Sequence, residues 1–219
     1  MLKNTILLGD SVFDNAAYVP GEPSVSEQLQ DALREDQIKV ALEAVDGSVT
    51  RDVIDHQLPR LTERCDAIVV SSGGNDALQH IDLIRHTEAA IIPEILSRFH
   101  SIREQFRQDY SNLLDKLAER SCPVMVATIY NPDFKRDDAL CALQGAAEAA
   151  LSFFNDVIVQ EATKRGLEIL DLREICAKTE DFANPIEPSA IGGNKIAQKI
   201  SGWVQQTLIL ESIPSTNCV

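Results

Sequence analysis

The chain alternates short apolar runs rich in β-branched residues with longer stretches in which apolar positions recur every three or four residues. Runs of the first kind predict buried strands, and stretches of the second kind predict amphipathic helices. Because the two alternate along the chain, we expect an α/β fold with a parallel sheet covered by helices on both faces. The five expected strands cover residues 5–8, 38–45, 67–71, 123–129 and 167–170.

Several helix ends are marked by their local chemistry. Residues 24–27 read Ser-Val-Ser-Glu, a capping box that starts a helix. Two long helices are expected at about 93–119 and 137–164, and Gly166 follows the second in the position where glycine ends helices. Pro188 is a favoured first helical residue, so we expect the last helix to begin there.

The length and the even pattern indicate one domain. A chain of 219 residues suffices for one α/β domain with a sizeable core and is short for two. We find no internal repeat and no low-complexity linker. The expected domain covers residues 1–211, followed by a loosely held tail at 212–219.

Composition excludes several kinds of partner. With 20 Lys and Arg against 34 Asp and Glu, the formal charge of −14 disfavours binding to nucleic acid and to anionic membranes. No apolar stretch is long enough to span a bilayer, and the N-terminal apolar run is shorter than that of a secretory signal. Five widely spaced cysteines without a Cys-x-x-Cys pair suggest neither a disulfide framework nor a zinc site. These features predict a cytoplasmic protein without a metal.

Four short polar blocks follow three of the expected strands and precede the last helix. They are Gly9-Asp10-Ser11, Gly47, residues 73–76 (Gly-Gly-Asn-Asp) and residues 184–189 (Asn-Pro-Ile-Glu-Pro-Ser). Taken singly, each is an ordinary turn. Ligands of doubly wound sheets bind where the carboxyl ends of the strands meet, so we expect the four blocks to form one site.

In this order the blocks resemble the GDSL or SGNH family of serine ester hydrolases. The resemblance covers most of the chain and implies a flavodoxin-like three-layer α/β/α sandwich. It implies an acyl-serine intermediate at Ser11 and an oxyanion hole made by the N–H groups of Ser11 and Gly47 and the side-chain amide of Asn75. Asp10 is expected to brace the loop. A small-molecule ester is the implied substrate, and no cofactor is implied.

The fourth block departs from the family, whose pattern there is Asp-x-x-His-Pro-Ser. Asn184 and Glu187 occupy the positions of the orienting Asp and of the basic His. An ordinary glutamate is about two pKa units less basic than histidine, a deficit of about 3 kcal/mol. A helix N-terminus would lower its pKa further, whereas burial would raise it. Glu187 has three alternative roles: a base for Ser11, a cap of the last helix, or an ion-pair partner of Arg51. Neutral Asn184 would orient a partner without stabilising a cation.

The sequence leaves open which residue acts as the base and whether the site is catalytically active. His80 and His86 follow the Asn75 block and are candidate substitute bases. The expected activity is therefore ester hydrolysis with an atypical base and slow turnover. The alternative is an impaired scaffold that binds an acyl or carbohydrate ligand. Four aromatic residues are expected to line an acyl pocket or to fill the core: Phe13, Tyr130, Phe134 and Phe182.

Overall fold

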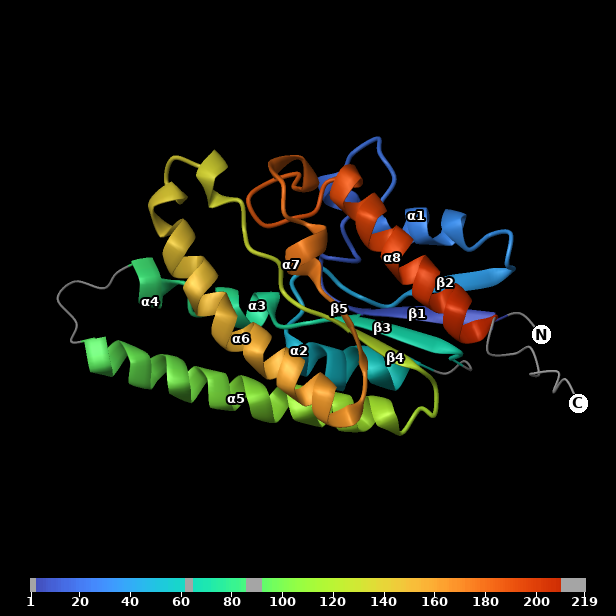
Figure 1. The fold of residues 1–219 in the computed structure, drawn as a ribbon, viewed down its shortest axis with the longest axis horizontal. Coiled ribbons are helices and arrows are strands. Elements are labelled where there is room, and N and C mark those ends of the chain that lie inside the picture. Colours follow the sequence, from blue (N-terminus) through green and yellow to red (C-terminus); the bar gives the residue numbers. More distant parts are fainter. Residues whose placement is uncertain (1–2, 62–64, 86–91, 210–219) are drawn as a thin grey trace, which may run out of the picture.

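The computed structural model describes residues 3–61, 65–85 and 92–209, and it contains one parallel five-stranded sheet in the order β2-β1-β3-β4-β5 (Figure 1). This architecture confirms the expected fold class. β2 and β4 end three and two residues earlier than expected. The strands are β1 (Lys3–Gly9), β2 (Ile38–Leu42), β3 (Ala67–Ser71), β4 (Val124–Ala127) and β5 (Glu168–Leu170).

Helices cover both faces of the sheet. α1 (Val25–Ala32) and α8 (Ala190–Leu208) pack on one face, and α5 (Ile92–Ala118) and α6 (Gln144–Arg165) pack on the other (Figure 1). Successive side chains of a strand point to opposite faces, so Leu7 joins the first core and its neighbours Ile6 and Leu8 join the second. Burial on both sides explains why the strands read as continuous apolar runs.

The remaining helices are short and lie around the carboxyl ends of the strands. They include α2 (Thr50–Asp52), α3 (Gly74–Leu78), α4 (Asp82–Arg85) and α7 (Leu172–Ile175). No helix that the structure describes combines the length and apolar character needed to cross a bilayer. The expected tail at 212–219 and the domain end at 211 lie outside the described residues.

Two helix starts differ from the sequence prediction. α6 begins at Gln144 rather than near 137, because the carbonyl of Asp137 accepts the N–H groups of Leu140 and Cys141 in a tight turn. α8 begins after Ser189, whose hydroxyl accepts the N–H of Gly192. The capping box at residues 24–27 is present as expected, and Gly166 ends α6 with a φ of 64°.

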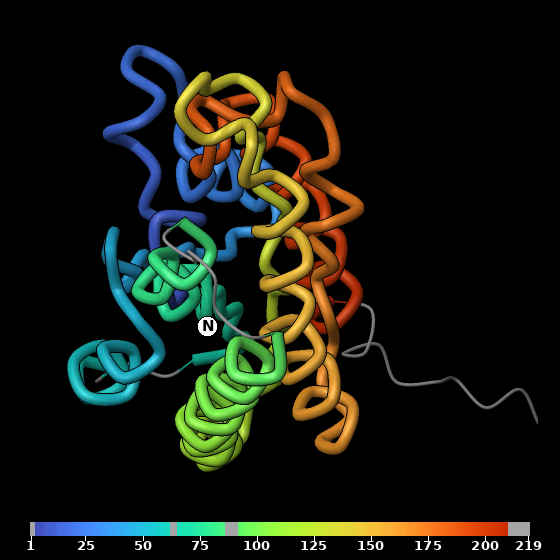
Figure 2. Tube along the Cα trace, turned by 90° about the vertical axis from the view of Figure 1, so that its left-hand side faces the viewer, coloured from blue at the N-terminus to red at the C-terminus, as the bar shows by residue number. Residues whose placement is uncertain are grey.

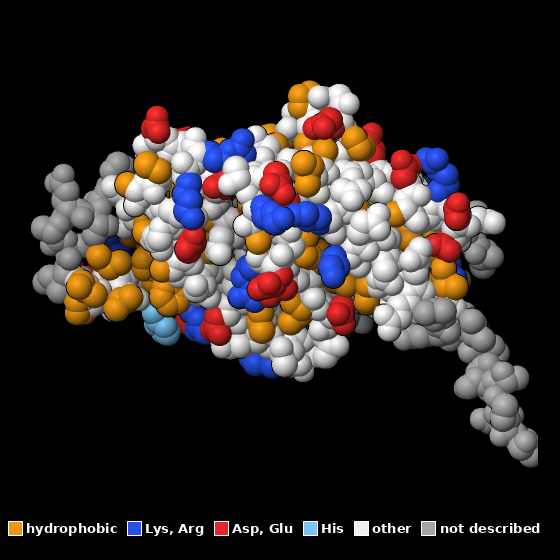
Figure 3. All heavy atoms as spheres, turned by 45° about the horizontal axis from the view of Figure 1, so that its top comes forward, with side chains coloured by type: hydrophobic (Ala, Val, Ile, Leu, Met, Phe, Trp, Pro, Cys, Tyr) orange, Lys and Arg blue, Asp and Glu red, His pale blue; other side chains and the backbone are white. Residues whose placement is uncertain are grey.

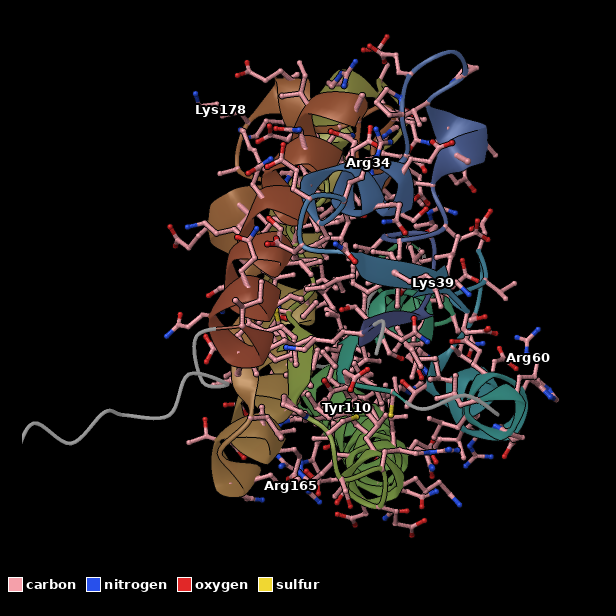
Figure 4. The ribbon with its side chains drawn as sticks, turned by 90° about the vertical axis from the view of Figure 1, so that its right-hand side faces the viewer. Arg34, Lys39, Arg60, Tyr110, Arg165 and Lys178 are labelled. Carbon is pink, nitrogen blue, oxygen red and sulfur yellow. The ribbon has the colours of Figure 1, made fainter. Side chains whose placement is uncertain are left out.

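A buried acid joins α5 to α6. Burial opposes ionisation of Glu161, but hydrogen bonds from Lys164, Arg165 and Arg107 outweigh it and lower its pKa to about 2. Figure 4, which faces the amino-terminal edge of the sheet, shows Arg165 at the end of α6 and Tyr110 beside the strands. This group of ion pairs joins α5 to α6 within the layer that covers one face of the sheet.

Two long loops meet above the carboxyl ends of the strands. The segments at about 130–145 (yellow) and 176–190 (orange to red) lie side by side at the top of Figure 2. The N–H of Asp133 donates to the Pro185 carbonyl at 2.8 Å, and Arg136 donates to the Phe182 carbonyl at 2.8 Å. These contacts hold the fourth block against the end of β4.

Candidate active site

Ser11 lies on a sharp turn directly after β1, and Gly9 makes that turn feasible. Gly9 has a φ of 124°, and a Cβ there would lie 1.7 Å from the Ser71 carbonyl oxygen of β3. Buried Gln57 fixes the same backbone, accepting from the Gly9 N–H at 2.8 Å and donating to the Gly9 carbonyl at 2.7 Å. Sequence reasoning missed Gln57, because it belongs to an irregular helical segment with no recognisable motif.

The fold brings the fourth block to the nucleophile position. The Ser11 hydroxyl donates to Glu187 Oε1 at 3.0 Å, and both residues are buried, with exposures of 8% and 5%. Asn184 Oδ1 accepts the N–H groups of Ile186 and Glu187 at 2.9 and 3.0 Å. The Tyr130 hydroxyl donates to the Ile186 carbonyl at 2.6 Å. Side chains from two loops therefore hold the Glu187 backbone in place.

The contacts do not match the two other roles considered for Glu187. Arg51 pairs with Asp109 of α5 at 3.1 Å. The side-chain cap of α8 comes from Ser189. Glu187 thus contacts Ser11, and it neither pairs with Arg51 nor caps α8.

Burial changes the electrostatics of two carboxyl groups at the site. It raises the pKa of Glu187 to about 7 and outweighs the opposing hydrogen bond from Ser11, and the nearby charges of Asp46 and Asp10 add smaller increases. Burial also raises the pKa of Asp10 to about 7, against hydrogen bonds from the Val12 N–H and the Ser71 hydroxyl. Asp10 binds the turn around Ser11 and makes no hydrogen bond to the serine side chain among the described residues. A pKa near 7 makes Glu187 about as basic as an ordinary histidine.

Two of the three residues expected to supply oxyanion donors, Ser11 and Asn75, line the same pocket. Within the described residues, the N–H groups of Ser11 and Gly47 have no acceptor. The Asn75 amide donates one hydrogen to the Ser48 carbonyl at 3.0 Å, which leaves its second hydrogen available. Gly47, with a φ of 80°, lies between Ser48 and Asp46 and is thereby joined to the Asn75 block. An oxyanion hole made of these three donors stays a prediction of the family resemblance.

An apolar pocket opens beside the serine, between α3, α4, α5, α6 and the loop after β4. Ser11, Asn75 and Glu187 form its polar end. Its apolar wall includes Leu78, Ile81, Ile84, Phe99, Ile129, Tyr130, Phe134, Leu151 and Phe154. Figure 3 shows hydrophobic side chains exposed at the end of the molecule that carries the start of α5, where Ile92 and Leu96 are exposed.

The lining of the pocket shows which of the candidate aromatic and histidine residues lie near the serine. Tyr130 and Phe134 line it, whereas Phe13 and Phe182 belong to the core beneath α1 and α8. His80 also lines the pocket but does not accept the hydrogen bond from the serine hydroxyl. His86 lies outside the described residues.

A sequence model of the GDSL-like lipase/acylhydrolase family matches residues 7–192. The chain belongs to that family. Membership makes this GDSL-like protein a carboxylic ester hydrolase. No curated protein sequence matches it.

Solved structures share its fold at low identity. An acetyl xylan esterase is 18% identical, with a TM-score of 0.69, over 92% of this chain and 99% of that one. A lipase from a goat rumen metagenome is 20% identical, with a TM-score of 0.69, over 91% and 96%. An extracellular lipase of Streptomyces rimosus is 19% identical, with a TM-score of 0.64, over 92% and 99%. Coverage of both chains is nearly complete, so the GDSL-like protein has the whole architecture of these hydrolases.

Proposed function

We propose that this GDSL-like protein hydrolyses carboxylic esters with an apolar acyl group through a Ser11–Glu187 dyad. The observation that carries the proposal is the 3.0 Å hydrogen bond from the Ser11 hydroxyl to a buried carboxylate. The apolar pocket beside Ser11 supports an apolar acyl group, because its walls can bury the chain while the ester carbonyl meets the serine.

The reaction proceeds in two halves. Glu187 accepts the hydroxyl proton while Ser11 Oγ attacks the ester carbonyl. The N–H groups of Ser11 and Gly47 and the Asn75 amide hold the oxyanion of the tetrahedral intermediate. Glu187 then returns the proton to the leaving alcohol oxygen, and the acyl-serine remains. In the second half Glu187 accepts a proton from water, which attacks the acyl-serine. Glu187 then returns that proton to Ser11 Oγ as the bond to the acyl group breaks and the carboxylic acid leaves.

A carboxylate base changes the charge balance of this cycle. With histidine, proton transfer from serine creates an imidazolium and an oxyanion. With Glu187, the single negative charge moves from the carboxylate to the oxyanion, and no cation forms. Asn184 suits this chemistry, because a neutral side chain adds no second negative charge and still positions the Glu187 backbone through two accepted hydrogen bonds.

Covalent labelling tests the proposal. A fluorophosphonate probe should label Ser11, and the protein should hydrolyse p-nitrophenyl butyrate. Ser11→Ala should lose both properties, while the matched control Ser152→Ala, which changes an exposed serine of α6, should keep them. Labelling elsewhere, or undiminished turnover by purified Ser11→Ala, would refute the dyad. Absence of labelling in a folded protein that binds fatty acids would favour the impaired scaffold instead.

A further inference from the structure

Carboxylates gather beside Ser11, outside the apolar pocket. Asp46 donates its N–H to Asp14 Oδ2 at 3.0 Å and accepts the Tyr18 hydroxyl at 2.7 Å. Asp14, Tyr18 and Asp46 do not line the pocket, whereas Glu187 borders it. Val45, next to Asp46, donates its N–H to the Gly9 carbonyl at 3.1 Å, and Asn15, next to Asp14, donates its side-chain amide to the Pro188 carbonyl at 3.2 Å. Both acids therefore lie beside the segments that carry Ser11 and Glu187. We call Asp14, Asp46 and Glu187 the acidic rim.

No cation neutralises the acidic rim within residues 3–61, 65–85 and 92–209. None of its three carboxylates forms an ion pair there, and the pocket wall contains no Lys or Arg. Arg60 lines the hollow that Asp46 borders, but it lies 3.9 Å from Glu43 and forms no ion pair with Asp46. Two other buried acids are paired with cations: Glu161 contacts three of them, and Asp181 pairs with Lys195 at 2.6 Å. The negative charge of the rim therefore remains available to a bound molecule.

Glu187 provides a second, independent indication of a missing partner. Its Oε1 accepts the serine hydrogen bond, but its Oε2 is buried and has no partner in the described part of the chain. Buried acceptors without partners are rare in native proteins because desolvation is then uncompensated. A substrate group that carries positive charge would compensate it.

The reaction fixes where such a group would lie. Glu187 must return its proton to the leaving oxygen, so that oxygen lies next to Glu187 while the acyl chain occupies the pocket. The rest of the alcohol then lies outside the apolar pocket, as Asp46 and the aromatic ring of Tyr18 do. Carboxylates and aromatic faces both attract ammonium groups.

We propose, on the basis of the hydrolase function above, that the preferred substrates are esters of cationic amino alcohols. The ammonium group lies against the acidic rim and the acyl chain lies in the apolar pocket. The same charge repels phosphorylated and other anionic alcohols, and the overall charge of −14 acts in the same direction at longer range.

The test compares two esters of equal shape, butyrylcholine and 3,3-dimethylbutyl butyrate, in which carbon replaces the charged nitrogen. At low salt kcat/KM should favour the choline ester by about tenfold, and high salt should reduce the preference. Asp46→Asn should bring the ratio close to one, and Asp14→Asn should lower it. The control Glu35→Gln removes one exposed charge in the turn that follows α1 and should leave the ratio unchanged.

The outcomes distinguish a failure of the cationic preference from a failure of the proposed Ser11–Glu187 dyad. Equal kcat/KM values for the two esters, or an unchanged ratio in a folded Asp46→Asn, would overturn the cationic preference while the neutral ester still reported the hydrolase. Failure to hydrolyse either ester or p-nitrophenyl butyrate would overturn both.

A second inference rests on a different observation, at the amino-terminal ends of the strands. Cys65 precedes β3, Cys122 precedes the neighbouring strand β4, and their Sγ atoms lie 3.0 Å apart. Both residues are half-buried. Burial, together with the hydrogen bond to Cys65, raises the pKa of the Cys122 thiol to about 12, so oxidation is slow at neutral pH. Adjacent strands hold backbones at a spacing that a disulfide can bridge.

We infer that Cys65 and Cys122 form a disulfide on exposure to a low-molecular-weight disulfide such as oxidised glutathione. One thiolate attacks a glutathione sulfur and releases one glutathione thiol. The second thiolate attacks the mixed disulfide and releases the other, so two protein thiols are oxidised and one glutathione disulfide is reduced.

Mass spectrometry after incubation with oxidised glutathione should find the Cys65–Cys122 cross-link, with two hydrogens lost. The melting temperature should rise by roughly 5–10 °C. Cys122→Ser should abolish both changes, and the control Cys141→Ser should retain them. A stable mixed disulfide, or no reaction after long incubation at raised pH, would overturn the inference.

Discussion

The pH dependence of catalysis gives the sharpest test of Glu187 as the base. Only the carboxylate form accepts the serine proton, so kcat/KM should rise as pH increases through the pKa of Glu187 in the free enzyme. Burial raises that pKa to about 7. Well below this pH, kcat/KM should fall about tenfold per pH unit, and the fall between pH 7 and pH 5 should be about fiftyfold, because the base is already half protonated at pH 7.

The position of the acidic limb distinguishes this site from an exposed carboxylate. A glutamate with its ordinary pKa of about 4.3 would leave kcat/KM nearly flat down to about pH 5. The assay is hydrolysis of p-nitrophenyl butyrate at low substrate concentration, followed at the isosbestic wavelength of the product from pH 4 to pH 9. Glu187→Gln should lower kcat/KM by about 10²–10⁴ and remove the limb. The control Glu180→Gln, an exposed acid near the start of the same loop, should keep the parent profile.

Two results would contradict the assignment of Glu187 as a desolvated base. A limb near pH 4.5 in the parent protein would mean that Glu187 is not desolvated as the structure indicates. A limb retained in Glu187→Gln would assign it to another group, and Asp10 is the first to examine, because burial raises its pKa to about 7 as well. A limb that disappears in Asp10→Asn and persists in Glu187→Gln would make that assignment. His80 would be next, since it lines the same pocket.

Three further predictions concern neighbouring side chains. Asn75→Ala should lower kcat by about 10²–10³ with little change in KM, because its free amide hydrogen acts on charge that develops in the transition state; a change in KM alone would contradict this. Burial raises the pKa of Asp10 to about 7, so the protonated form of Asp10 is favoured in the folded protein. Its contribution to the free energy of unfolding is complete below the pKa of Asp10 in the unfolded chain and is lost as pH rises through about 7. The loss amounts to about 4 kcal/mol. Melting curves of Asp10→Asn should therefore vary less between pH 4 and pH 8 than those of the parent. The double variant Asn184→Asp with Glu187→His restores the family pattern and should hydrolyse aryl esters faster than either single variant; a slower double variant would show that the surrounding loop suits only a carboxylate.

The sequence predicted the sheet and the residues of the site because both depend on patterns that survive without tertiary information. Apolar runs located all five strands, and the carboxyl ends of parallel strands meet at one side of the sheet, so Ser11 and Asn75 were expected to share a site, and they line one pocket. The role of Gly47 in that site stays a prediction. Pocket-lining Tyr130 and Phe134 were expected with two other aromatics that proved to be core residues, because aromatic side chains occur in both places.

What the sequence did not reveal depends on contacts between distant segments. Gln57 fixes Gly9 across 48 residues, and the Tyr130 hydroxyl reaches Ile186 across 56. Neither contact has a local signature. The basicity of Glu187 was undecided for the same reason, because burial and helix-end effects act in opposite directions and only the packed structure gives their balance.

The two departures from the family pattern are chemically linked. An acidic residue at position 184 stabilises a protonated histidine, but beside a glutamate base it would place a second negative charge next to the carboxylate and oppose oxyanion formation. Asn184 avoids that charge and keeps the positioning role through its two accepted backbone hydrogen bonds. Burial meanwhile brings the pKa of Glu187 to about 7, where a base is half ionised at neutral pH and strong enough to accept a proton from serine. In the proposed mechanism the pair therefore forms a consistent alternative to Asp and His, in which desolvation supplies the basicity that an imidazole has by itself.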